Sequence, residues 1–250
     1  MNELGMYEDI VLAGSAQHNL AKVAILYSES ADIWLSPVGT PGAAKRSLYL
    51  ALRHAQIPVD VVNEEDCSRG SLNHYSMLFI VTPQVSEEAV TAIGAWVATG
   101  GHAYITAGGA QLNEANQTNA AMAKLSGIKQ EGTWTGTRYS RHNATIFFIK
   151  EELPFAEELD VVTVIATETS PAETLGVFGE KSIVKWAPPP TAKRGKDYNI
   201  TAIFEDGSPA SFSMAVGKGV LHYTAFHPGL SCNFTINRPS LYGLFLRDCL

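Results

Sequence analysis

The chain is poor in cysteine and in charged residues. Its 250 residues include three cysteines, Cys67, Cys232 and Cys249, and only 17% of its residues are charged. Because the cysteines are few, scattered and without a Cys-x-x-Cys pair, a disulfide framework and a zinc knuckle are excluded, and a reducing compartment is predicted. Hydrophobic residues make up 46% of the chain. This share predicts a large buried core and excludes a mainly disordered chain.

Long apolar runs and a basic surface are also missing. Charged residues interrupt every apolar stretch before it reaches the roughly 20 residues that span a bilayer, which predicts a soluble protein with no membrane partner. The first residues carry acids at Glu3, Glu8 and Asp9. They therefore do not resemble a secretory signal, and a cytoplasmic location is expected. The formal net charge of -7 argues against nucleic acid as a partner.

Residues 22–127 alternate between strand and helix patterns. Short, nearly all-apolar runs predict buried strands, and apolar residues at helical spacing predict the helices that follow them. The sharpest helix pattern starts at Ser86, has Glu87 and Glu88 in its first turn, and ends at Gly100-Gly101. The predicted strands cover residues 22–27, 58–62, 77–82 and 102–106, and the predicted helices cover about 43–56, 86–99 and 114–125.

The second half of the chain has strand patterns and almost no helical periodicity. Asp206-Gly207 and Gly217-Lys218-Gly219 separate successive runs where hairpins need positive φ, so the last strands are expected to form a meander. The predicted strands here are 145–149, 161–167, 174–178, 182–186, 199–204, 211–216 and 220–226.

The order of these elements predicts the α/β fold class. We expect a flavodoxin-like, open and mostly parallel sheet with helices on both faces, elaborated by a β-rich C-terminal half. Because no linker separates the halves, a single domain over residues 1–250 is expected. It comprises an α/β core at 22–127, a β-rich extension at 128–238 and a closing helix at 239–250.

Two stretches of the chain resemble a known family. The first reads VDVV at 59–62, continues through Leu72, Tyr75 and LFIVTP at 78–83, and ends with AWV at 95–97 and GG at 100–101. The second reads FEDGSPA at 204–210, GKG at 217–219 and FHPG at 226–229. Over residues 22–230 the chain is similar to the class I glutamine amidotransferase-like superfamily, and within it to the β-galactosidase trimerisation domain.

The resemblance implies that the amidotransferase reaction is lost. Catalytic members of the superfamily use a cysteine at a sharp strand-to-helix turn, and the His and Glu of a Phe-His-Pro-Glu motif. Carried over to this chain, the nucleophile position is Ala107, the imidazole is His227, and Gly229 stands where the acid belongs. Because the thiol and the orienting carboxylate are both missing, we expect no catalytic residue. No cofactor and no metal are expected either.

The implied role is that of a non-catalytic module for oligomerisation or assembly in carbohydrate metabolism. Its expected partner is a further copy of the chain or an associated glycosidase. A large catalytic barrel precedes this domain in the β-galactosidase family, whereas none precedes it in this sequence.

The alternative hypothesis is a small-molecule binding protein or a hydrolase. In an open α/β sheet, ligands bind beyond the carboxyl ends of the strands, where the strand order reverses. A sugar or another polar metabolite would suit the residues there, and the amides of the two glycines with the helix start behind them would favour an anion. Glu29 and Asp32 with His227 could run acid–base chemistry. The predicted ligand-binding residues are Ser28, Glu29, Thr82, Gly108, Gly109 and His227.

Other residues have two interpretations each. Cys232 is either a displaced nucleophile or a small buried residue beside the last helix. His222 and His227 with Cys232 suggest zinc, but an odd separation in a strand sends the two imidazoles to opposite faces, which argues against a shared ion. Trp34 and Trp134 mark either contact with a partner or packing under a loop.

Overall fold

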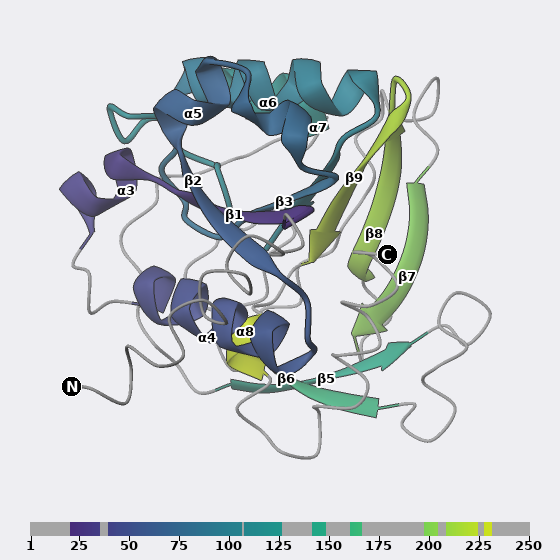
Figure 1. The fold of residues 1–250 in the computed structure, drawn as a ribbon. Coiled ribbons are helices and arrows are strands. Elements are labelled where there is room, and N and C mark those ends of the chain that lie inside the picture. The colour runs from purple at the N-terminus through teal and green to yellow at the C-terminus, as the bar shows by residue number, and fades with distance from the viewer. Residues whose placement is uncertain are drawn as a thin grey trace, which may run out of the picture.

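A single mixed sheet crosses the computed structural model (Figure 1). In the described residues it has nine strands, in the order β2-β1-β3-β4-β9-β8-β7-β5-β6. The structure describes residues 21–35, 40–106, 108–126, 142–148, 161–166, 198–204, 209–224 and 228–231.

Neighbouring strands are parallel in the first half of the sheet. They are β2 (Val59–Asn63), β1 (Val23–Tyr27), β3 (Met77–Ile80), β4 (His102–Ile105) and β9 (Gly219–Thr224). With β9 as the fifth strand, this is the 2-1-3-4-5 order of the flavodoxin-like fold. Residues of β1, β3 and β4 are almost all buried, because helices cover both faces of a parallel sheet. The predicted α/β class and parallel core are confirmed.

The other half of the sheet is antiparallel. β8 (Pro209–Val216) pairs with β9 through the predicted turn at Gly217, which has a φ of 62°. β7 (Tyr198–Phe204), β5 (His142–Phe148) and β6 (Val161–Ala166) continue the sheet by antiparallel pairing of their backbones. The predicted strands at 174–178 and 182–186 and the closing helix at 239–250 lie outside the described residues, so the full β-rich extension stays a prediction.

Helices lie on both sides of the parallel strands (Figure 1). α5 (Glu64–Ser68), α6 (Glu87–Thr99) and α7 (Ala120–Ser126) cover one face. α4 (Thr40–His54) and the short α8 (Pro228–Ser231) cover the other. α3 (Glu29–Trp34) follows β1, and the 3-10 helix η1 (Ser71–His74) leads into β3. None of the described helices has the length and hydropathy needed to cross a bilayer.

The predicted ends of α6 are confirmed. The Ser86 hydroxyl accepts a hydrogen bond from the backbone N–H of Ala89 at 3.3 Å, and Gly100 caps the other end with a φ of 130°. The predicted helix at 114–125 is wrong at its start, because α7 begins at Ala120. The Asn113 side chain accepts hydrogen bonds from the N–H groups of Ala115 and Gln117 and so holds this segment in a loop.

Two glycine positions explain the close packing of α6 on the sheet. A Cβ on Gly101 would lie 2.2 Å from the Trp96 indole, and a Cβ on Gly219 would lie 2.2 Å from the carbonyl oxygen of Val97. Neither distance is possible for a side chain. The Gly-Gly and Gly-Lys-Gly motifs therefore allow the β8–β9 hairpin to pack against the end of α6.

Candidate functional site

The strand order reverses between β1 and β3, and the carboxyl ends of these strands mark the expected ligand site. Chain segments that follow three strands meet there: Ser28 to Ser30 after β1, Glu64 after β2, and Thr82 to Ser86 after β3. The fold therefore brings together Ser28 and the segment containing Thr82, as the sequence predicted.

A buried carboxylate occupies this position. Glu64 is only 7% exposed, and its Oε1 lies 2.5 Å from the Ser28 hydroxyl, which also lies 2.6 Å from the carbonyl oxygen of Gln84. The Ser30 hydroxyl donates to Glu64 Oε2 at 2.9 Å, and the backbone N–H of Ser86 approaches the same atom at 3.4 Å. The reversal point is thus filled by the protein's own hydrogen-bonded side chain.

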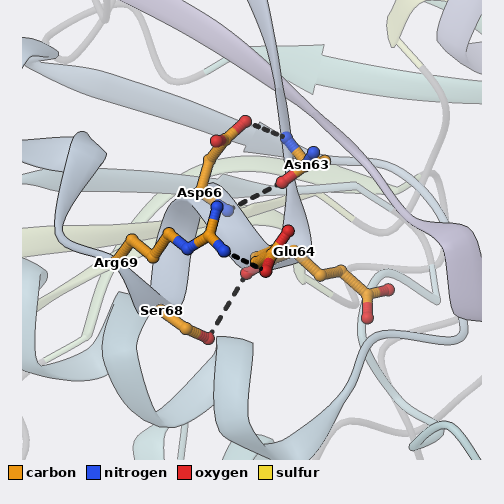
Figure 2. Close-up of polar contacts among 6 residues, drawn as sticks. Asn63, Glu64, Asp66, Ser68 and Arg69 are labelled. Carbon is orange, nitrogen blue, oxygen red and sulfur yellow. Dashed lines mark hydrogen bonds and ion pairs between the residues drawn. The ribbon is translucent and has the colours of Figure 1, made fainter.

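Local structure at the end of β2 positions Glu64. Asn63 and Asp66 form a capping box, in which the Asn63 side chain accepts from the Asp66 N–H at 2.7 Å and Asp66 Oδ2 accepts from the Asn63 N–H at 3.1 Å (Figure 2). The Ser68 hydroxyl donates to the Glu64 carbonyl at 3.4 Å (Figure 2). Because this capping box starts α5 directly after the strand, Glu64 is the first residue of the helix and lies at the edge where the parallel strands end.

Glu29, the predicted acid, lies outside the buried network. It is exposed in the first turn of α3, where desolvation raises the pKa of its carboxyl and the charge of Glu64 raises it further. The sequence analysis missed Glu64, although an acid directly after a predicted strand was the signal that could have identified it.

The loop after β4 is a tight turn. The N–H of Gly109 donates to the Thr106 carbonyl at 2.8 Å, and Gly108 has a positive φ of 78°, which glycine adopts without strain. The N–H of Gly108 approaches the hydroxyl of the buried Tyr223 at 3.5 Å. Both amides thus have partners within the protein.

The expected helix start behind these glycines is absent, because the chain continues in a loop until α7 begins at Ala120. The structure therefore contains no helix N-terminus at Gly108 and Gly109 to attract an anion. Ala107 and His227 lie outside the described residues. The ligand-binding role of the six predicted residues stays a prediction.

Four buried side-chain oxygens near the ends of β3 and β4 have no hydrogen-bond partner in the described part of the chain. Thr82 and the segment after β4 are adjacent, since the N–H of Ala110 donates to the Thr82 carbonyl at 2.9 Å. Because an unpaired buried oxygen is costly, a group of four needs an explanation. The four oxygens are Thr82 Oγ1, Gln84 Oε1, Thr106 Oγ1 and Gln111 Oε1.

Gln111 lies in the loop after β4, and its side chain contacts the Tyr223 hydroxyl of β9. Burial raises the pKa of Tyr223 to about 12, while hydrogen bonds from the Gly108 N–H and the Gln111 side chain act in the opposite direction. No signal in the sequence pointed to Gln111, since its contact with Tyr223 depends on β9 lying beside β4.

Cys67 is the cysteine that the structure describes, and His102 and His222 form a pair of neighbouring imidazoles. Cys67 is buried, and desolvation raises the pKa of its thiol to about 12, so little reactive thiolate forms at neutral pH. His102 Nδ1 and His222 Nε2 lie 3.5 Å apart. In the described ranges, no three metal-ligating side chains meet. Cys232 lies outside the described residues.

Trp34 is half exposed and anchored at the same edge of the sheet. Its indole N–H donates to the carbonyl of Glu114 at 2.7 Å, so the ring is held against the loop between β4 and α7. Trp134 lies outside the described residues.

Solved structures share the fold of this chain, but the comparisons of its sequence find no match. No family model matches the chain, and no curated protein matches it. Among solved structures, the β-galactosidase from Bacillus circulans sp. alkalophilus superposes with a TM-score of 0.60 and 16% identity over 92% of this chain and 30% of its own. The β-galactosidase from Halorubrum lacusprofundi has a TM-score of 0.56 and 16% identity over 93% of this chain and 31% of its own.

A shorter protein has the same fold. A cytoplasmic protein from Salmonella typhimurium LT2 matches with a TM-score of 0.51 and 11% identity, over 91% of this chain and all of its own. The chain spans less than a third of each of the two galactosidases. At these identities the matches show a shared fold.

Proposed function

We propose that this chain, which has the class I glutamine amidotransferase-like fold in the form of the β-galactosidase trimerisation domain, is a non-catalytic module that associates with further copies of itself. We place this role in carbohydrate metabolism, with an associated glycosidase as a further partner. One observation carries the proposal: the position where this fold class binds ligands is filled by Glu64.

The Glu64 network supports a structural role for the strand ends. Hydrogen bonds to a charged group are worth about 1.5–3 kcal/mol each, and the Ser28 and Ser30 hydroxyls both lie within 3 Å of the Glu64 carboxylate. A ligand at the reversal point would have to break these bonds before making its own. The arrangement therefore favours a closed site over a receptor.

The chemistry of the chain supports the same proposal. Alanine stands at position 107, where attack would begin, and glycine stands at position 229, where the acid would orient the imidazole. Cys67 cannot replace the thiol, since its pKa is about 12 and its side chain is buried. We expect no release of ammonia from glutamine.

Size-exclusion chromatography with light scattering tests the association. The expected result is a stable oligomer of defined mass at micromolar concentration. Substituting the strand-end residues Ser28 and Thr82 should leave this mass unchanged. A strict monomer at high micromolar concentration contradicts the proposal.

The second candidate function is binding of a small polar molecule, and the four unpaired buried oxygens favour it. Hydroxyl and amide oxygens of Thr82, Thr106 and Gln111 would bind a sugar or a similar neutral metabolite through its hydroxyl groups. A ligand that binds only the folded state raises its melting temperature.

Thermal shifts across a panel of sugars and polar metabolites test this candidate. A shift that disappears in Thr82→Val and persists in Thr91→Val, which changes an exposed threonine of α6, supports it. A flat response across the panel contradicts it and leaves the association proposal intact.

A further inference from the structure

A groove of about 340 Å³ lies between α6 and α7, which lie side by side on one face of the sheet (Figure 1). Its apolar lining consists of Val90, Gly94, Ala121, Leu125 and, at the end of β8, Val216. Small-molecule sites have volumes of about 300–1,000 Å³, mostly apolar walls and a few polar groups. The groove has these properties, and it shares no residue with the strand-end position that Glu64 fills.

Gly94 is a glycine that neither packing nor backbone conformation explains. It lies in the middle of α6, where glycine is the least favourable residue after proline. Its φ is not positive, and a Cβ would lie 3.4 Å from Leu125 Cδ1, an ordinary contact distance. Gly101 and Gly219, by contrast, leave no room for a Cβ. The effect of glycine at position 94 is to keep the groove open, because a side chain there would extend toward Leu125.

Lys124 is the charged residue of the groove. It is exposed in the last turn of α7, and no carboxylate in the described part of the chain forms an ion pair with it. The Glu87 carboxylate accepts hydrogen bonds from the Asn113 side chain at 3.2 Å and from the Ala120 N–H at 3.4 Å. The hydroxyl of Thr91, the other polar group of the lining, donates to the Glu87 carbonyl at 2.7 Å. The ammonium of Lys124 is therefore available to a ligand, and its charge favours an anion.

We propose that this groove binds a small carboxylic acid, whose apolar body lies between α6 and α7 and whose carboxylate pairs with the ammonium of Lys124. The apolar walls favour a hydrocarbon chain or an aromatic ring over a sugar, since hydroxyl groups would lose their water there without gaining partners. A single ammonium matches a single negative charge, and none of the described lining residues is an acid that could bind a basic ligand. The site does not depend on the proposed association of the chain.

Calorimetric titration with octanoate and with 3-phenylpropionate tests the site. We expect a Kd of about 1 mM or below for at least one of these acids at low ionic strength. The corresponding amides, octanamide and 3-phenylpropionamide, keep the apolar body without the charge. Each amide should bind about two- to fivefold more weakly than its acid, which is the range of an exposed ion pair. Added salt should reduce this difference.

Lys124→Gln tests the role of the charge. It should weaken binding of the acid about two- to fivefold, to the affinity of the amide, and should leave binding of the amide unchanged. Lys22→Gln, which removes an exposed lysine directly before β1, is the matched control and should change neither affinity.

Gly94→Ala tests the groove without destabilising the fold. Because alanine is more favourable than glycine in a helix, Tm should stay the same or rise by up to about 4 °C. The new methyl group narrows the groove beside Leu125, so the affinities for the acid and for its amide should both fall about fivefold or more. Ala95→Ser, at an exposed position of α6 that does not line the groove, should change neither affinity.

Three results would overturn the proposal. The first is that neither acid binds at about 10 mM. The second is that acids and amides bind equally, or that Lys124→Gln leaves binding of the acid unchanged. The third is that Gly94→Ala changes the mass of the chain in light scattering and not its affinity for the acid, which would assign the groove to a second copy. A monomeric chain that binds the acid as described supports this site and contradicts only the proposed association.

Discussion

Replacing Glu64 by alanine removes the acceptor at the centre of the buried network. The substitution takes away the partner of the Ser30 hydroxyl at 2.9 Å and one of the two acceptors of the Ser28 hydroxyl. Ser28 keeps the carbonyl of Gln84, so one charged hydrogen bond is lost outright and another is partly compensated. At about 1.5–3 kcal/mol for each such bond, we expect a loss of about 3 kcal/mol in the free energy of unfolding.

Thermal denaturation followed by circular dichroism measures this loss. For a chain of this size, about 3 kcal/mol lowers Tm by roughly 6–12 °C. Glu65→Ala is the matched control, because it changes the next residue of the same helix, which is exposed and pairs with Arg69 on the surface. That pair is worth about 0.2–1 kcal/mol. If the two variants lower Tm equally, the Glu64 network does not stabilise the fold and our argument for a closed site is refuted.

Three further predictions concern packing, protonation and reactivity. Gly219→Ala should lower the free energy of unfolding by about 3 kcal/mol, because the new Cβ would lie 2.2 Å from the Val97 carbonyl oxygen; Gly94→Ala in α6, with 3.4 Å to its nearest neighbour, should not destabilise. Burial lowers the pKa of His102 from 6.5, so the unfolded state binds more protons and stability should fall as pH decreases below about 6.5; a His102→Gln variant that keeps the same pH dependence contradicts this. Burial raises the pKa of Cys67 to about 12, so iodoacetamide at pH 8 should label it, as mapped by mass spectrometry, only after unfolding; rapid labelling of the folded chain refutes its burial.

Long periodic elements were predictable from the sequence because their signals are local. The apolar runs of β1 and β3 and the caps of α6 at Ser86 and Gly100 are readable within each segment. The short helices α3 and α5 were missed, because helices of six and five residues contain too few turns to show a period.

The site was predictable only in outline. Parallel topology places the ends of β1 and β3 together, so Ser28 and Thr82 could be selected in advance. Glu29 was selected and Glu64 was missed, because the sequence does not show which acid near the strand ends is buried. That choice depends on the capping box that begins α5 directly after β2.

The sequence by itself determined the alternation of strands and helices, the core-forming segments, and the lack of a thiol and an acid at positions 107 and 229. Only the tertiary structure decided that β2 lies at the sheet edge, that β9 lies beside β4, and that Glu64 fills the strand-order reversal. The physical reason is the difference in sequence separation between local patterns and tertiary contacts. Local patterns record the burial and backbone preferences of neighbouring residues, whereas Ser28 meets Glu64 across 36 residues through the order in which strands pack.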